Sequence, residues 1–150
     1  MRSLFVFGRL IFGGFFAYNG LNHFLHQKSM SHYAEAKGVP AAESAVPATG
    51  AMLLAGGASI MAGLKPRQGL AAVIGFLIPV TLQMHRFWEE QDPNQRLAEF
   101  TNFSKNVALI GAALMMLNID EPWPGSVPAL MAEEEMFVRL GGRDLRALPA

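Results

Sequence analysis

The sequence predicts an all-α integral membrane protein, a four-helix bundle with short interfacial helices and a Pro-rich C-terminal tail. Three observations support this fold class. Of the 150 residues, 51% are hydrophobic and only 16% are charged, against about 25% charged in a typical soluble domain. The mean hydropathy is +0.25. The apolar residues also gather in four segments, and a single soluble core of this length would not bury so much apolar surface.

The four apolar segments have lengths suited to crossing a bilayer. Residues 4–25 are apolar apart from a few polar side chains, and residues 48–64 and 69–85 contain no charge. Residues 107–119 form a shorter run, which a helix beginning near Arg96 would extend. A spanning helix needs about 17–25 residues, and its backbone groups must be paired internally. The alternative, a soluble bundle of buried helices, predicts a polar stripe that the second and third segments lack.

The connecting segments complete the predicted organisation. We expect a short interfacial helix at residues 31–37 in the first connector. The tail contains three prolines, and we expect a surface helix at residues 129–140 after them. Asp92-Pro93-Asn94 is typical of a turn or a helix start. We therefore divide the chain into a four-helix transmembrane domain, residues 1–119, and a C-terminal tail, residues 120–150.

Small residues four positions apart indicate how the helices associate. In lipid, such residues allow two helix backbones to approach closely. The second apolar segment carries an unbroken row of them, which predicts a helix-packing face: Ala51, Ala55, Ser59 and Gly63. The alternative is that Gly and Ala are simply frequent in spanning helices.

Polar side chains gather where the bundle would place the ends of helices one and three and the start of helix four. These three points lie at one membrane boundary, opposite the termini. Ionisable residues in membrane helices are costly and indicate a functional site by default. We therefore predict a polar ligand pocket at this boundary, formed by Asn19, His23, Gln83, His85, Arg86, Trp88, Asn102, Lys105 and Asn106.

Arg9 is a further candidate binding residue. It lies inside the first apolar segment, near the membrane boundary at which we expect the two chain termini. We expect it to act within the bundle, by bonding Ser59 or the carbonyls of another helix. The alternative is that it reaches the lipid headgroups.

Several pocket residues also have simpler interpretations. His23 would then only cap a helix end, and Arg86 and Lys105 would extend to lipid phosphates. Trp88 would belong to the aromatic belt at the membrane interface.

Composition excludes several function classes. Twelve Lys and Arg balance twelve Asp and Glu, which argues against a nucleic-acid partner. The chain has no Cys, so disulfides, thiolate metal sites and electron relay through thiols are excluded. Histidines on two helices could bind a metal, but no acidic residue in the spans supports the set, and we predict no metal site.

Three ordered stretches resemble the DoxX family of small bacterial membrane proteins. They are Arg9-x3-Gly13-x6-Gly20-x2-His23 followed by Gly38-Val39-Pro40, then His85-Arg86-Phe87-Trp88, and then Glu99-x3-Phe103-x-Lys105-Asn106-x-Ala108-Leu109-x-Gly111. Together they cover about residues 4–118. The resemblance implies a four-helix protein of the bacterial cytoplasmic (inner) membrane. It also implies a link to membrane oxidoreductase systems, including a quinone-reducing subunit and oxidative-stress assemblies.

Two functions follow as expectations. The first is an accessory or quinone-interacting subunit of a bacterial membrane oxidoreductase, with His23, Arg86 or Lys105 bonding the quinone oxygens. The alternative is a non-catalytic structural subunit that stabilises a larger membrane redox or photosynthetic assembly. Either way, we expect membrane lipid and other membrane subunits as partners, quinone as a non-covalent cofactor in the first case, and both termini in the cytoplasm. A transporter is disfavoured because the spans lack acidic residues and an inverted repeat.

Overall fold

The computed structural model describes the backbone of residues 2–144 and the side chains of residues 2–140. The described residues form helices joined by turns and loops, and they contain no strand, which confirms the all-α prediction. The helices are α1 (Arg2–Leu25), α2 (Gln27–Ala36), α3 (Ala42–Ala62), α4 (Pro66–Met84), α5 (Pro93–Met116) and α6 (Val127–Asp144).

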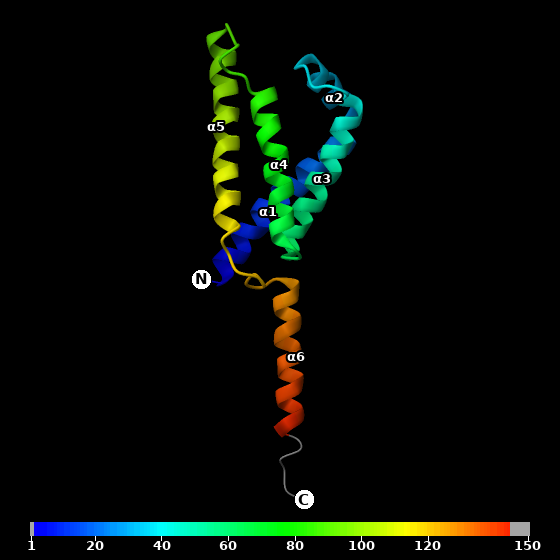
Figure 1. Cartoon of the computed structure of the whole chain (residues 1–150), viewed down its shortest axis with the longest axis vertical. Helices are drawn as coiled ribbons and strands as arrows, with labels where there is room; N and C mark the ends of the chain where they lie inside the picture. The colour runs from blue at the N-terminus through cyan, green and yellow to red at the C-terminus, as the bar shows by residue number, and fades with distance from the viewer. Residues whose placement is uncertain (1, 145–150) are drawn as a thin grey trace, which may run out of the picture.

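Four long helices lie alongside one another, and the other two lie at opposite ends of them (Figure 1). α3 packs against α1, α4 and α2, and α5 packs against α4. The short helix α2 and the loop between α4 and α5 form one end, which we call the rim end. α6 extends away from the other end, the tail end, where the N-terminal part of α1 also lies (Figure 1).

Local sequence signals account for several helix boundaries. The Asp92 carboxylate accepts hydrogen bonds from the backbone N–H groups of Asn94 and Gln95, at 3.0 and 2.8 Å, and Pro93 occupies the first turn of α5. At the end of α3, Gly63 adopts a left-handed conformation with φ of 66°. Of the two structures predicted for Asp92-Pro93-Asn94, a turn or a helix start, the structure shows a helix start, and α5 begins at Pro93 and not near Arg96.

The closest helix contact, between α1 and α3, is made by glycines. A Cβ atom added to Gly13 would lie 2.7 Å from the carbonyl oxygen of Gly57. A Cβ atom added to Gly20 would lie 2.7 Å from the carbonyl oxygen of Gly50. Both distances are too short for a real carbon atom, so the two backbones touch directly, as expected for helices packed through small residues.

The small-residue row predicted on the second segment lies beside this contact. Ala51 and Ala55 are exposed, Ser59 is half-buried, and Gly63 is buried only at the end of α3. The physical reason is that neighbouring positions on the same helix carry glycines, which allow closer approach than alanines do. Within the described chain, Ala51 and Ala55 thus remain free for contact with lipid or another protein.

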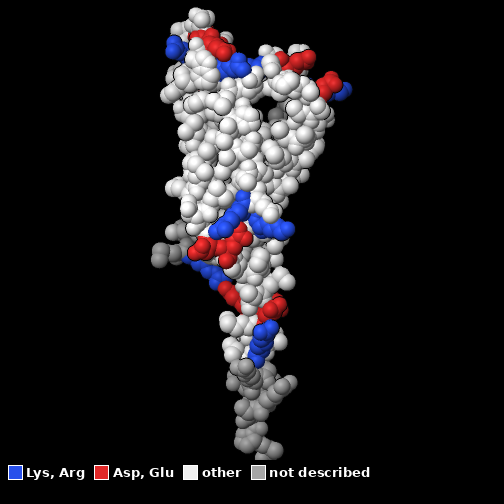
Figure 2. Space-filling model, in the orientation of Figure 1, with Lys and Arg blue, Asp and Glu red and all other residues white. Residues whose placement is uncertain are grey.

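Three helices, α1, α3 and α4, are long and apolar enough to cross a membrane. Figure 2 shows charged residues at the rim end and again near the start of α6, with a band of uncharged side chains between them. α5 does not belong to this group, because the part of the helix before Val107 is polar and carries Arg96, Glu99 and Lys105. The fourth span, and with it the four-helix transmembrane bundle, stays a prediction.

The core lies between α1, α3 and α4 and extends toward the tail end. Its fully buried side chains include Phe16, Leu53, Ile60 and Val73. Trp123, in the loop before α6, is also fully buried, and its ring meets Phe5 edge-on at 5.6 Å. This loop therefore closes the tail end of the core.

Candidate functional site

A cavity of about 850 Å³ lies among α1, α2, α3 and α4 at the rim end. Figure 2 shows an opening between the helices near this end. The volume is within the range of pockets that bind small molecules, and most of the wall is apolar. The wall includes four of the predicted site residues: Asn19, His23, Gln83 and His85.

His23 is buried, and its ring orientation is fixed. Its Nδ1 lies 2.7 Å from the backbone carbonyl oxygen of Asn19, one turn earlier on α1. A carbonyl oxygen only accepts hydrogen bonds, so Nδ1 carries the proton and donates it. The ring packs edge-on against Phe76 of α4, with centroids 5.8 Å apart. In the neutral imidazole, Nε2 then carries the lone pair.

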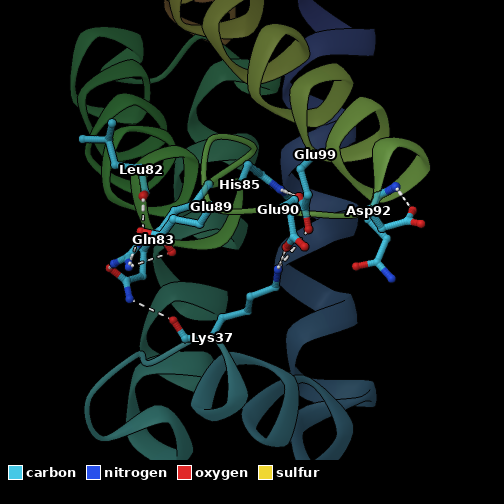
Figure 3. A network of polar contacts seen from close by, with 10 residues as sticks. Lys37, Leu82, Gln83, His85, Glu89, Glu90, Asp92 and Glu99 are labelled. Atoms are coloured by element: carbon cyan, nitrogen blue, oxygen red, sulfur yellow. Dashed lines mark hydrogen bonds and ion pairs between the residues drawn. The ribbon is translucent and has the colours of Figure 1, made fainter.

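His85 belongs to a network of charged groups beside the cavity (Figure 3). Its Nδ1 donates to Oε2 of Glu99 at 2.7 Å. The Lys37 ammonium donates to Oε1 of Glu99 at 3.1 Å and to Oε1 of Glu90 at 3.3 Å. The network thereby joins the α2–α3 connector, the end of α4 and the start of α5.

Opposing effects act on the Lys37 ammonium. Burial lowers its pKa, but the hydrogen bonds and charges of Glu99 and Glu90 raise the pKa by more, so the net shift is upward from 10.5. Lys37 is therefore a fixed positive charge at physiological pH, and it holds the Glu99 carboxylate in place beside His85.

Gln83 links the cavity wall to the surface. Its Nε2 donates to the backbone carbonyl of Lys37 at 2.9 Å, and its Oε1 accepts from Arg86 at 2.6 Å (Figure 3). Arg86 also pairs with Glu89 at 3.3 Å. Arg86 thus positions Gln83 from outside, and it is not a wall residue of the cavity.

The remaining residues of the predicted polar ligand pocket lie apart from the cavity wall. Trp88 is half-exposed and packs edge-on against Phe87 at 5.1 Å, in an aromatic group at the start of α5. Lys105 is exposed and donates to Asn102 at 3.0 Å. Asn106 is buried on α5. The structure therefore gathers the residues of α1 and α4 around one cavity and leaves those of α5 outside it.

Arg9 lies at the tail end, far along α1 from His23. It is 4% exposed, and its guanidinium donates to the carbonyl oxygens of Gly125 at 3.1 Å and Pro124 at 3.4 Å. Its position inside the bundle agrees with the sequence expectation. However, its partners belong to the loop before α6, and neither Ser59 nor another helix supplies them.

Three members of the network were not among the predicted site residues: Lys37, Glu90 and Glu99. Lys37 directly precedes the Gly38-Val39-Pro40 stretch, and Glu99 begins the third stretch of the family resemblance. That closeness to motifs was the available signal. Their pairing joins positions far apart in the sequence, which spacing alone does not reveal.

A comparison with known protein families shows to which family the chain belongs. The family model described as DoxX matches residues 4–86, more than half of the sequence. The chain belongs to the DoxX family. DoxX proteins are small membrane proteins, often linked to oxidoreductase-associated roles. The match covers α1 to α4 and therefore every helix of the cavity wall. No curated protein and no solved structure matches the chain.

Proposed function

We propose that this DoxX protein is a quinone-interacting accessory subunit of a bacterial membrane oxidoreductase complex. The observation that carries the proposal is the apolar cavity of about 850 Å³ with two histidines in its wall. Quinones combine an apolar ring and tail with two polar oxygens. A mostly apolar cavity with a few polar groups suits such a molecule.

The contacts of the cavity refine the choice of binding residues. The sequence predicts His23, Arg86 or Lys105 as partners for the quinone oxygens. Arg86 is committed to Gln83 and Glu89, and Lys105 lies on the exposed surface of α5. We therefore assign the polar contacts to His23 and His85, with the ring and tail among the apolar wall residues.

We also propose that α5 is the fourth membrane-crossing helix. It has 24 residues, and its second half is apolar from Val107 onward. It runs alongside α4 (Figure 1). Four crossings would place the start of α1 and the whole tail on one side. We assign that side to the cytoplasm and the bundle to the bacterial cytoplasmic membrane.

The quinone proposal is tested by ligand-dependent thermal stability. Decylubiquinone is added to the purified protein in detergent, and a bound ligand at 100 times its Kd should stabilise the fold by about 2.7 kcal/mol. The Gly75→Phe variant should lose this shift, because Gly75 lines the cavity and the space beside it is open. Gly111→Phe is the matched control, since Gly111 also faces open space but lies outside the cavity wall. A wild-type protein without any shift would refute the proposal.

Exposed apolar surface favours a second function, that of a structural subunit in a larger redox or photosynthetic assembly. α6 presents Leu130, Met131 and Phe137 to the surroundings, and Ala51 and Ala55 of α3 are also exposed. A partner subunit would cover such surface.

Co-purification from the native membrane separates the two functions. Ala55→Leu adds bulk to the exposed row and should release a partner, whereas His23→Ala should leave the assembly intact. If both variants assemble like the wild type, the exposed row of α3 is not a binding face.

A further inference from the structure

We infer that the cavity selects the reduced, hydroquinone form of its ligand, through ring nitrogens of His23 and His85 that accept hydrogen bonds from its hydroxyl groups. This inference rests on the proposed function, because it takes the ligand to be of the quinone class. It adds the redox state that is bound and the atoms that distinguish it.

The first acceptor is Nε2 of His23. Because Nδ1 donates to the Asn19 carbonyl at 2.7 Å, the neutral ring presents a lone pair at Nε2. The ring is held by this bond and by Phe76, and only 8% of the residue is exposed. Exchanging the roles of the two nitrogens would bring a lone pair against the carbonyl oxygen, so the tautomer is fixed.

The second acceptor is Nε2 of His85. Its Nδ1 donates to the Glu99 carboxylate at 2.7 Å, and Lys37 holds that carboxylate from the other oxygen at 3.1 Å. In the neutral imidazole, Nε2 of His85 then carries the lone pair and can accept a hydrogen bond from a hydroxyl group.

The amide groups of the wall do not reverse this balance. The Gln83 oxygen accepts from Arg86, and one of its two N–H groups donates to the Lys37 carbonyl, so one donor remains. One N–H group of Asn19 donates to the Phe15 carbonyl at 2.7 Å, which leaves one donor and its oxygen as a further acceptor. The two imidazole nitrogens and the Asn19 oxygen therefore outnumber the two remaining amide donors.

Two hydroxyl groups of the wall also donate their protons to backbone carbonyls and are not free to donate to a ligand. Thr49 donates to the backbone carbonyl of Ala45 at 2.8 Å, and Ser29 donates to that of His26 at 3.0 Å. Tyr33 lies at the cavity edge and is half-exposed, and its hydroxyl can both donate and accept. The buried part of the wall therefore offers more acceptors than donors.

This balance determines which redox state fits. The oxidised quinone has only carbonyl acceptors, so its oxygens would face the lone pairs of the two imidazoles without a proton between them. In an apolar cavity an unpaired polar group is costly. The hydroquinone has a hydroxyl proton on each oxygen and can donate to both rings. Binding requires no transfer of electrons, so the selectivity is a property of this chain alone.

The experiment compares four probes with the same apolar tail: decylubiquinol, decylubiquinone, the dimethyl ether of decylubiquinol and decylbenzene. Binding to the wild-type protein in detergent is measured under anaerobic conditions by the thermal shift at increasing ligand concentration. We expect the hydroquinone to bind at least about tenfold more tightly than the quinone or the ether, because only it supplies donors. Decylbenzene should bind most weakly.

A variant pair tests the histidine assignment. His23→Phe keeps an aromatic ring against Phe76 but removes the acceptor, and should reduce the preference for the hydroquinone to about threefold or less. His26→Phe is the control, because His26 is exposed and outside the cavity wall, and it should keep the full preference. The wild-type comparison of hydroquinone and ether decides the inference even if His23→Phe does not fold.

The outcomes separate this inference from the proposed function. Equal binding of hydroquinone, quinone and ether, all tighter than decylbenzene, would leave the proposed function standing and overturn the selectivity. Equal binding of all four probes would mean that any alkyl chain fills the cavity, and both would be wrong. The same holds if none of the probes binds.

Discussion

Nδ1 of His85, at the end of α4, donates a hydrogen bond to Oε2 of Glu99 on α5 over 2.7 Å. The other oxygen of the same carboxylate accepts from Lys37, just after α2. Only 13% of the Glu99 side chain is exposed, so both bonds are largely shielded from competing water. One carboxylate thereby holds together three segments of the rim end.

We predict that Glu99→Gln lowers the stability of the protein by roughly 1–3 kcal/mol, because the charged partner of Lys37 and His85 is lost. The thermal unfolding midpoint in detergent measures this. Glu89→Gln is the control. Glu89 pairs with Arg86, but its side chain is 57% exposed, and its loss should cost less than about 1 kcal/mol. Equal effects of the two substitutions would contradict the role given to Glu99.

The pH dependence of the Lys37 contribution has a defined sign. Its pKa in the folded state is raised above 10.5, so its stabilising effect is fully present below the unfolded value and is lost as the pH rises through the folded value. The stability difference between the wild type and Lys37→Met should therefore stay constant from about pH 7.5 to 9.5, and shrink only at more alkaline pH. Chemical denaturation at several pH values measures it. A difference that disappears below pH 9 would contradict the raised pKa.

The sequence predicts the helices well because their signals are local. Charge-free runs, Asp92 before Pro93 and the small-residue content of α3 each depend on residues close together in the chain. The faces that pack are harder to predict. Each residue turns a helix by about 100°, so the predicted row through Ala51 and Ala55 lies close to the true contact through Gly50 and Gly57, yet outside it.

The candidate site was predicted only in part for a related reason. The sequence places polar residues near the correct end of the bundle but does not fix the side of the helix that each one occupies. His23 and His85 line the cavity, whereas Lys105 lies on the exposed surface of α5. The ion pair of Lys37 and Glu99 depends on the fold as a whole and has no local signal.

The direct backbone contact between α1 and α3 makes Gly13 intolerant of any side chain. We predict that Gly13→Ala destabilises the protein by at least about 2 kcal/mol, because the new Cβ atom would meet the Gly57 carbonyl and the helices would have to separate. Gly8→Ala, in the same helix but facing open space, should be neutral or slightly stabilising. Thermal unfolding of both variants gives the comparison, and a stable Gly13→Ala protein would exclude the close contact.

The buried guanidinium of Arg9 fixes the loop that leads to α6. It donates to two consecutive carbonyl oxygens, of Pro124 and Gly125, while its Nε is buried without a partner. Arg9→Met would leave both carbonyls without their donor. Because Pro124 is exposed and Gly125 is only partly buried, water can replace part of these bonds, and the loss should cost about 1–3 kcal/mol in total. We therefore predict faster amide hydrogen exchange at residues 120–126 and a lower unfolding midpoint.

Arg2→Met is the matched control for Arg9, because it also removes an arginine of α1 near the tail end. Arg2 pairs with Glu133 of α6 at 2.9 Å, but both side chains are about half-exposed. Such pairs contribute less than about 1 kcal/mol. Exchange at residues 120–126 should therefore stay slow in Arg2→Met and become fast in Arg9→Met. If the two variants behave alike, the exposed ion pair and not the buried guanidinium holds the loop in place.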